Sequence, residues 1–294
     1  MIKFLLLFLL SFPFAQTVSD YSYTYAEVSA MAGAVVAEPG SNWSIFHNPA
    51  GITEVDGIHL SAGSGNLYGF KWLPTYNLSG NVPLPVFGKI GFALQQLETK
   101  YNGTVLSTEQ ILSFAQGFEL QHDKNSRLSI GYTANFIQWN LAKSAGVSGN
   151  GSDGLSLGSI HAVTIDLGVL ASLRKKYRFG VLLKNINSGA LGKGITRQVL
   201  PRRINAGITY IPIPGLSTSI VSEHLLGRED LQMKGAIRYT LNPFLELYAG
   251  AQSNPNRFGL GITLLGTSRQ SISYGLLTHP VLSMTHQINI GISL

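Results

Sequence analysis

Apolar and polar residues alternate along most of the chain after residue 57. The alternation is clearest in residues 128–136, 161–169, 204–210, 231–239 and 258–264. A two-residue period is typical of β-strands, because successive side chains point to opposite faces of a sheet. One face is apolar and the other is small, polar or charged, as in transmembrane β-barrels. A soluble β-sandwich would also alternate, but it would carry more charges on its outward face.

The pattern predicts an all-β fold, an antiparallel transmembrane β-barrel of about 14 strands, an even number as in bacterial outer-membrane barrels. The strands are expected to begin near Gly57, Gly69, Phe87, Glu109, Arg127, Ser159, Tyr177, Leu200, Leu216, Asp230, Phe244, Asn256, Arg269 and Met284.

The lengths of the connections support this interpretation. The two longest, residues 142–158 and 186–199, fall on the same end of the predicted barrel, and the connections at the other end are short. Long extracellular loops and short periplasmic turns are typical of outer-membrane barrels. Tyr177, Tyr210 and Tyr239 lie beside short turns and are expected to form a periplasmic aromatic girdle.

Composition agrees with an exported membrane barrel. Charged residues make up 12% of the chain, against about 25% in soluble domains, and there are 33 glycines and no cysteine. The formal net charge of +6 would favour nucleic-acid binding in a cytoplasmic protein. Export argues against that partner, so we expect no nucleic acid and attribute the charge to loops and lumen.

The N-terminal region divides into two parts. Residues 1–15 have a short basic start and an apolar run that ends at Ala15, as in a secretory signal peptide. Residues 16–56 are expected to form an N-terminal extension and a hatch, and residues 57–294 to form the barrel. The chain has no run of about 20 apolar residues, so no transmembrane helix is predicted.

Residues 30–57 lack both a helical and a strand period, although they are small and apolar. They contain Asn48, Pro49, Ala50 and Gly51, where proline fixes one φ angle and glycine frees another. An irregular segment before a long series of strands indicates a plug inside the barrel. The alternative is an ordinary N-terminal loop with a helical turn.

Several ionisable residues fall on the inward phase of the strands. Charges in a lumen must be paired or hydrated, and two interpretations remain open. They pair with one another and with Glu38, Glu54 or Asp56 of the hatch, or they form a cationic lumen that guides a ligand. The candidate lumen charges are Asp166, Arg178, Lys184, Arg203, Glu223, Lys234, Arg238 and Arg257.

No catalytic site is predicted. Residues 154–158 match G-x-S-x-G, but a nucleophile elbow needs a strand before it and a helix after it. Here a Gly- and Ser-rich stretch precedes the motif and a strand follows it. The seven histidines show no metal-ligand spacing, and no phosphate-binding glycine loop opens a helix. We therefore expect no enzyme activity, no metal and no cofactor.

Several motifs carry a family resemblance. The Asn48-Pro49-Ala50-Gly51 motif after the small-residue run at 32–34 resembles the hatch of FadL-like outer-membrane barrels. Residues 165–168, 179–185 and 200–210, with the C-terminal stretch 259–286, resemble the PorV/PorQ branch of that group.

The PorV/PorQ resemblance implies a barrel in the outer membrane of a diderm bacterium that assists protein secretion or surface assembly. Its partners would be outer-membrane lipid and lipopolysaccharide, the barrel-assembly machinery during insertion, and secreted or surface proteins. The wider FadL resemblance implies the alternative function, passive transport of hydrophobic or small ligands.

Overall fold

A computed structural model describes residues 23–84, 88–102, 104–144, 146–149, 153–193, 197–227, 231–267 and 269–294. The predicted signal peptide, residues 1–15, lies outside the described residues. Among the described residues, no helix is long and apolar enough to cross a membrane.

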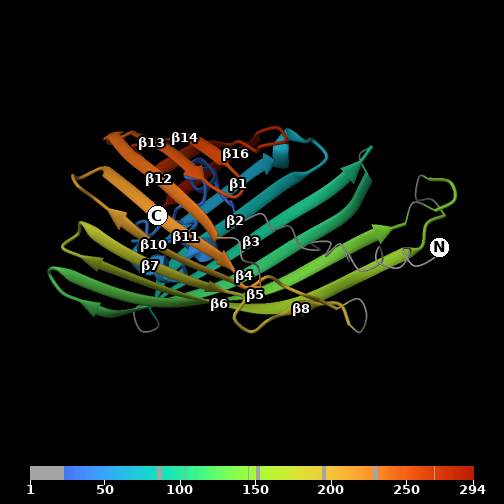
Figure 1. The fold of residues 1–294 in the computed structure, drawn as a ribbon, viewed down its shortest axis with the longest axis horizontal. Coiled ribbons are helices and arrows are strands. Elements are labelled where there is room, and N and C mark those ends of the chain that lie inside the picture. Colours follow the sequence, from blue (N-terminus) through green and yellow to red (C-terminus); the bar gives the residue numbers. More distant parts are fainter. Residues whose placement is uncertain are drawn as a thin grey trace, which may run out of the picture.

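The fold is a closed antiparallel barrel of 14 strands, as predicted (Figure 1). The sheet closes where β1 pairs with β16, with His59 opposite Ser293. The barrel strands are β1 (His59–Asn66), β2 (Pro74–Leu84), β3 (Gly88–Tyr101), β4 (Thr104–His122), β5 (Ser126–Lys143), β6 (Ser156–Leu173), β7 (Tyr177–Lys184), β10 (Arg203–Tyr210), β11 (Leu216–Leu225), β12 (Leu231–Asn242), β13 (Leu245–Gln252), β14 (Arg257–Leu265), β15 (Gln270–Leu277) and β16 (Thr285–Ser293).

The two faces of the sheet follow the alternation in the sequence. In β6, Val163, Ile165 and Leu167 are 37–48% exposed on the outside, whereas Thr164 and Asp166 between them are buried inside. The other strands repeat this pattern, so the apolar face points outward. This arrangement suits a lipid environment, where outward side chains need no polar partner.

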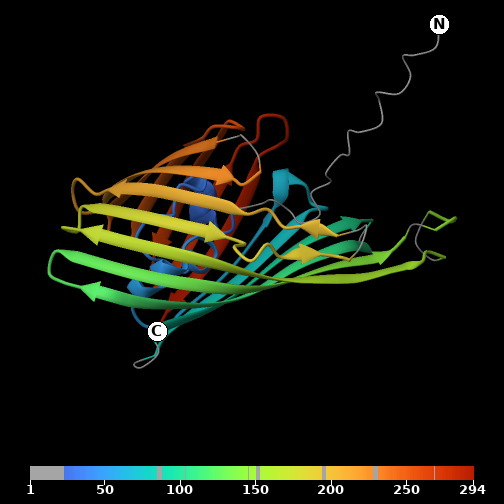
Figure 2. The same ribbon diagram turned by 60° about the horizontal axis from the view of Figure 1, so that its bottom comes forward.

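The two ends of the barrel differ. At the turn end, short connections join neighbouring strands, as between Leu173 and Tyr177, and the chain enters β1 there. At the loop end, β3 to β6 extend beyond the other strands, with 14, 19, 18 and 18 residues (Figure 2). The long connection after β7 contains a separate two-stranded sheet, β8 (Ala190–Leu191) with β9 (Gln198–Val199).

Two predicted strand starts are wrong by five residues. Residues near Gly69 form the 3-10 turn η2 (Leu67–Gly69), and the strand begins at Pro74. The strand expected at Glu109 begins at Thr104, because the β3–β4 hairpin continues to a tight turn. Neither error changes which face a residue occupies.

If the outer face of the barrel lies in a bilayer, a charged residue on it should destabilise the protein more at the middle of the membrane than at its surface. Leu167 and Leu173 both point outward from β6, but Leu173 ends the strand at the turn end. Leu167→Arg should destabilise the barrel by about 2–4 kcal/mol, and Leu173→Arg by about 0–1 kcal/mol near the interface. Urea unfolding in lipid vesicles measures both. Equal costs would contradict this placement of the membrane.

Candidate functional site: the N-terminal segment in the lumen

Residues 23–56, here called the N-terminal segment, lie inside the barrel (Figures 1 and 2). They form three short helices, α1 (Ala26–Ala30), α2 (Ser44–His47) and the 3-10 helix η1 (Pro49–Glu54). Helix α1 packs against β13 to β16, α2 against β3 and β4, and η1 against β3 to β6. The segment therefore touches opposite sides of the inner wall.

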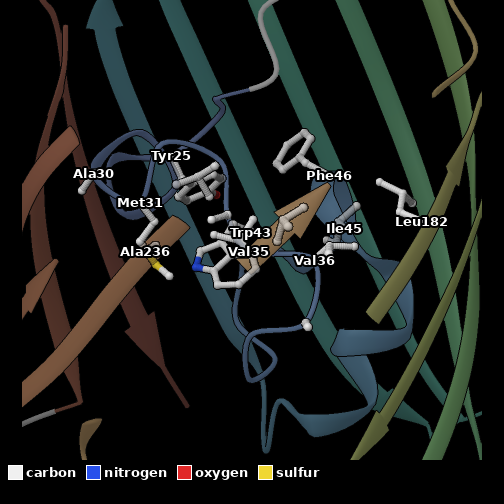
Figure 3. Packing of buried hydrophobic residues seen from close by; sticks show 14 of the residues in the cluster. Tyr25, Ala30, Met31, Val35, Val36, Trp43, Ile45, Phe46, Leu182 and Ala236 are labelled. Atoms are coloured by element: carbon white, nitrogen blue, oxygen red, sulfur yellow. The ribbon is translucent and has the colours of Figure 1, made fainter. Parts of the chain in front are cut away.

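The side chains of the N-terminal segment make up most of the main apolar cluster of the molecule. Tyr25, Met31, Trp43 and Ile45 are each at most 4% exposed, and they meet inward residues of the wall such as Leu182 (Figure 3). Burial on this scale stabilises the seating of the segment by about 1.5–3 kcal/mol for each large apolar side chain. The segment is thus a packed part of the fold.

The predicted motif, Asn48-Pro49-Ala50-Gly51, shapes the junction between α2 and η1. Asn48 caps η1, because its Oδ1 accepts a hydrogen bond from Ala50 N at 3.2 Å, and Pro49 opens the helix. Asn48 Nδ2 donates to Val36 O at 2.7 Å and to Val169 O of β6 at 3.1 Å. The motif thus fixes the fold of the segment and ties it to the wall.

Glycines of the wall let the main chain of the segment approach the strands. A Cβ built on Gly275 would lie 2.0 Å from Ala26 O, and one on Gly250 would lie 2.3 Å from the carbonyl carbon of Met31. Any larger residue there would displace the segment. The inward glycines in such contact are Gly131, Gly180, Gly250, Gly259 and Gly275, and Gly168 meets the side chains of Asn48 and Pro49 in the same way.

Polar anchors hold the middle of the segment. The buried Glu38 carboxylate accepts hydrogen bonds from the hydroxyls of Thr209, Ser217 and Ser219 on β10 and β11. Arg178 of β7 pairs with Glu54 of η1 and donates to Ala37 O at 3.1 Å. The prediction that a lumen charge pairs with the segment is therefore met at Arg178. Glu38 instead uses hydroxyl groups, which alternation does not reveal.

The structure places four of the predicted cations in the loop-end half of the inner wall. We call Lys184, Arg203, Lys234 and Arg257 the basic arc. Lys184 lies directly opposite Arg203 between β7 and β10, and Gln252 of β13 is paired with both Lys234 and Arg257.

One carboxylate, Glu223, serves the basic arc. Its two oxygens pair with Arg203 Nη1 at 3.1 Å and Lys234 Nζ at 2.7 Å. Within the described part of the chain, neither Lys184 nor Arg257 has a carboxylate within ion-pair distance, and Arg257 Nε is buried without a hydrogen-bond partner. Arg257 lies over the Tyr23 ring at 5.1 Å from its centroid. Among the described residues, the arc therefore has more cations than carboxylates.

The remaining predicted lumen charges lie elsewhere. Arg238 pairs with Glu246 at 2.8 Å near the turn end. Asp166 accepts from Asn135 Nδ2 at 2.9 Å and from Asn185 N at 2.7 Å, so it holds the start of the loop after β7. The eight predicted residues thus all face inward but do not form one site.

The loop after β7 folds into the mouth of the barrel. Leu191 of β8 and Leu200 pack on Ile137 and Ala162, which point inward from β5 and β6. Ile111 and Ile160 extend this cluster. Sequence analysis missed this apolar mouth, because two-residue strands such as β8 leave no period to detect.

A cavity of about 700 Å³ opens beside the segment at the turn end. Tyr25 and Trp43 of the segment line it, together with Glu27, Arg238 and Glu246. Its walls come from the β12–β16 side of the barrel and from β1.

No arrangement typical of an active site is present among the described residues. No group of three or more His, Asp or Glu residues there could hold a metal ion. Ser156 of the G-x-S-x-G match is the first residue of β6, so a strand and not a helix follows it.

Fold and lumen together define a class: a closed 14-stranded barrel of outer-membrane type with its N-terminal segment inside. No protein-family profile and no curated protein matches the chain. Solved structures share the fold. The CymD monoaromatic hydrocarbon channel is 10% identical, with a TM-score of 0.61 over 92% of this chain and 97% of that one.

Two further structures are similar. The Ralstonia pickettii toluene transporter TbuX is 12% identical, with a TM-score of 0.59 over 93% of this chain and 98% of its own. A Pseudomonas aeruginosa FadL homologue is 12% identical, with a TM-score of 0.51 over 91% and 97%. The chain therefore has the FadL-like outer-membrane barrel fold, as the wider resemblance implied.

Because main-chain atoms of the segment touch glycines of the wall, replacing such a glycine should destabilise the protein, whereas replacing a glycine without such a contact should not. Gly250→Ala should destabilise the protein by about 1–3 kcal/mol, as overpacking does. Gly235→Ala on the outward face of the neighbouring strand β12 is the control, because the nearest atom to its Cβ would lie 3.9 Å away. Urea unfolding in detergent measures both. Equal effects would show that the segment is not packed against Gly250.

The Arg178–Glu54 pair should keep the N-terminal segment in place, whereas the barrel should fold without it. Arg178→Gln leaves the largely buried Glu54 carboxylate with its hydrogen bond from Gly40 N but without its cation, which costs up to about 3–5 kcal/mol, and it should expose Trp43 and Phe46 to chymotrypsin. The double variant with Glu54→Gln should be cleaved more slowly than Arg178→Gln alone, because no unpaired charge remains. Unchanged cleavage in Arg178→Gln would contradict the anchoring role.

Proposed function

We propose that this protein is a passive outer-membrane channel for small, largely apolar molecules, and that the N-terminal segment closes its lumen. One observation carries the proposal: a segment of the chain packs inside a closed barrel against opposite sides of the wall. A channel needs both a wall and a device that limits leakage, and the segment is suited to be that device.

The apolar mouth supports the ligand class. Leu191, Leu200, Ile137 and Ala162 form a buried apolar cluster in the inner wall at the loop end, beside the place where a ligand would enter. Pockets for small ligands are mostly apolar with a few polar groups. The similar structures, a monoaromatic hydrocarbon channel and a toluene transporter by their titles, favour the same class.

The basic arc adds a polar element deeper in the lumen. Its cations would attract the electron-rich or negatively charged end of an otherwise apolar ligand, as rings of charge do in pores. The arc would then bias which molecules pass the mouth. In this proposal the lumen charges act by attraction and carry out no chemistry on the ligand.

Placement in the outer membrane of a diderm bacterium belongs to the same proposal. The turn end would face the periplasm and the loop end the outside, as loop lengths indicate. Outer-membrane lipid, lipopolysaccharide and the barrel-assembly machinery would then be the partners of the folded and folding protein. Secretion of other proteins rests on the PorV/PorQ resemblance alone, and no comparison supports it.

Ion conductance in planar bilayers tests the closing role. A variant that lacks residues 24–54 should insert and conduct more than the intact protein, because the segment no longer occupies the lumen. Heat-modifiable migration on gels confirms that the variant is folded. A folded deletion variant that conducts no more than the intact protein would contradict the proposal.

A reversible cross-link gives a sharper test, since the chain has no cysteine. Thr53 Oγ1 of η1 and Ser129 Oγ of β5 are 2.9 Å apart, so cysteines there bring two sulfurs together. The Thr53→Cys, Ser129→Cys variant should take up labelled toluene slowly when oxidised and normally after reduction. Each single variant is the control and should not respond to reductant.

A further inference from the structure

A groove of about 840 Å³ lies on the outer wall of the barrel, across β7, β10, β11 and β12. Its floor consists of small outward residues and its sides of large apolar ones. Phe179 and Ile208 on its sides are 47% and 50% exposed. In the membrane placement proposed above, this groove faces lipid. The residues of its floor and upper wall are Ala206, Thr218, Ser222 and Met233.

The groove ends beside an unusually basic turn. Tyr210 and Pro212 line its lower end, and Ile211 N donates to Lys176 O at 2.8 Å. Lys176 belongs to the exposed run Arg174-Lys175-Lys176 between β6 and β7. On the groove side, the turns at residues 211–215 and 243–244 carry no charge, whereas the turn at 123–125 on the other side, whose Asn125 O accepts from Arg174 N, contains Asp123 and Lys124. The three successive cations of residues 174–176 thus lie next to the groove.

The backbone conformation of this turn is unfavourable for residues such as arginine and lysine. Arg174 and Lys175 have φ values of 52° and 57°, and Lys176 N donates to Leu173 O at 3.1 Å. Positive φ at both central residues is the condition for a type I′ hairpin turn, which favours Asn-Gly. A Cβ crowds the following carbonyl oxygen in this conformation, so residues other than glycine and asparagine are disfavoured there. Strain of this kind points toward a function for the residues that bear it.

We propose that the groove and the turn together bind one anionic phospholipid of the periplasmic leaflet. An acyl chain lies in the groove, and the phosphate lies against Arg174, Lys175 and Lys176. The stacked rings of Tyr177 and Tyr210, 5.2 Å apart between centroids, lie between these two parts. Aromatic side chains favour this level of a bilayer, where headgroups meet acyl chains.

Charge complementarity selects the occupant. Phosphatidylglycerol carries a net negative charge, which three clustered cations attract, whereas phosphatidylethanolamine carries none. A transmembrane helix of another protein would use the groove but would have no need of the cations. The inference rests on the proposed membrane placement and is independent of transport.

Native mass spectrometry of the full-length protein, released from detergent with added lipid, tests the site. Phosphatidylglycerol should be retained in preference to phosphatidylethanolamine. The Arg174→Asn, Lys175→Gly variant should lower that retention by about fivefold for each cation, because a Lys or Arg near an anionic surface contributes about 1 kcal/mol. The same variant should unfold no more easily than the parent, since it relieves the turn.

Two matched variants separate the parts of the site. Arg269→Asn removes a turn cation with a similar φ of 60°, away from the groove, and should leave retention unchanged. Ser222→Phe fills the groove and should reduce retention, whereas Ala134→Phe on the outward face of β5 should not. Equal retention of both lipids, or retention that survives Arg174→Asn, Lys175→Gly, would overturn the proposal. Lipid selectivity in a protein that fails to conduct would refute transport alone.

Discussion

Closure of the sheet by the β1–β16 pair is the constraint on which the rest of the molecule depends. In hydrocarbon an unpaired backbone group costs several kcal/mol, so every strand needs neighbours on both sides. Fourteen strands satisfy this requirement, but they enclose a lumen that is wider than their own inward side chains can fill. The N-terminal segment occupies part of that space. Its main-chain atoms pack directly against glycines of the strands.

Anchoring of the segment uses little net charge. Glu38 is held by hydroxyls, and Glu54 by Arg178 and by Gly40 N, so hydrogen bonds offset the cost of burying these carboxylates. In the basic arc, Arg203 and Lys234 pair with Glu223, and among the described residues neither Lys184 nor Arg257 has a carboxylate within ion-pair distance. These four cations lie on the loop side of the segment.

The sequence predicts this fold well because alternation is a local property. The period of two residues placed Ile165 outward and Asp166 inward without knowledge of any neighbour, and an even number of strands followed from counting. Grouping of the lumen charges could not be predicted. Arg203 meets Lys184 and Glu223 only through the register of three strands, which depends on how the barrel closes.

The contacts of the short elements could not be predicted from the sequence either. The Asn48-Pro49 motif indicated a bend, but its contact with Val169 requires the position of β6. The inward glycines carried a signal, since 33 glycines exceed what turns need, yet their partners are main-chain atoms of a segment without a period. A glycine-rich inward phase is the feature that could have located the seat of the segment.

The glycine contacts also restrict how the lumen could open. Because carbonyl groups of Ala26 and Met31 abut the wall, rotating side chains cannot clear a path, and the main chain of the segment has to move. Its two halves differ in the room they have. Helix η1 is enclosed by β3 to β6 and tied down by Arg178, whereas α1 belongs to the half that borders the turn-end cavity of about 700 Å³. The polar anchors of η1, among them Arg178–Glu54 and Thr53–Ser129, therefore have to break before the segment can leave the wall of β3 to β6, and the cavity gives α1 the room to follow.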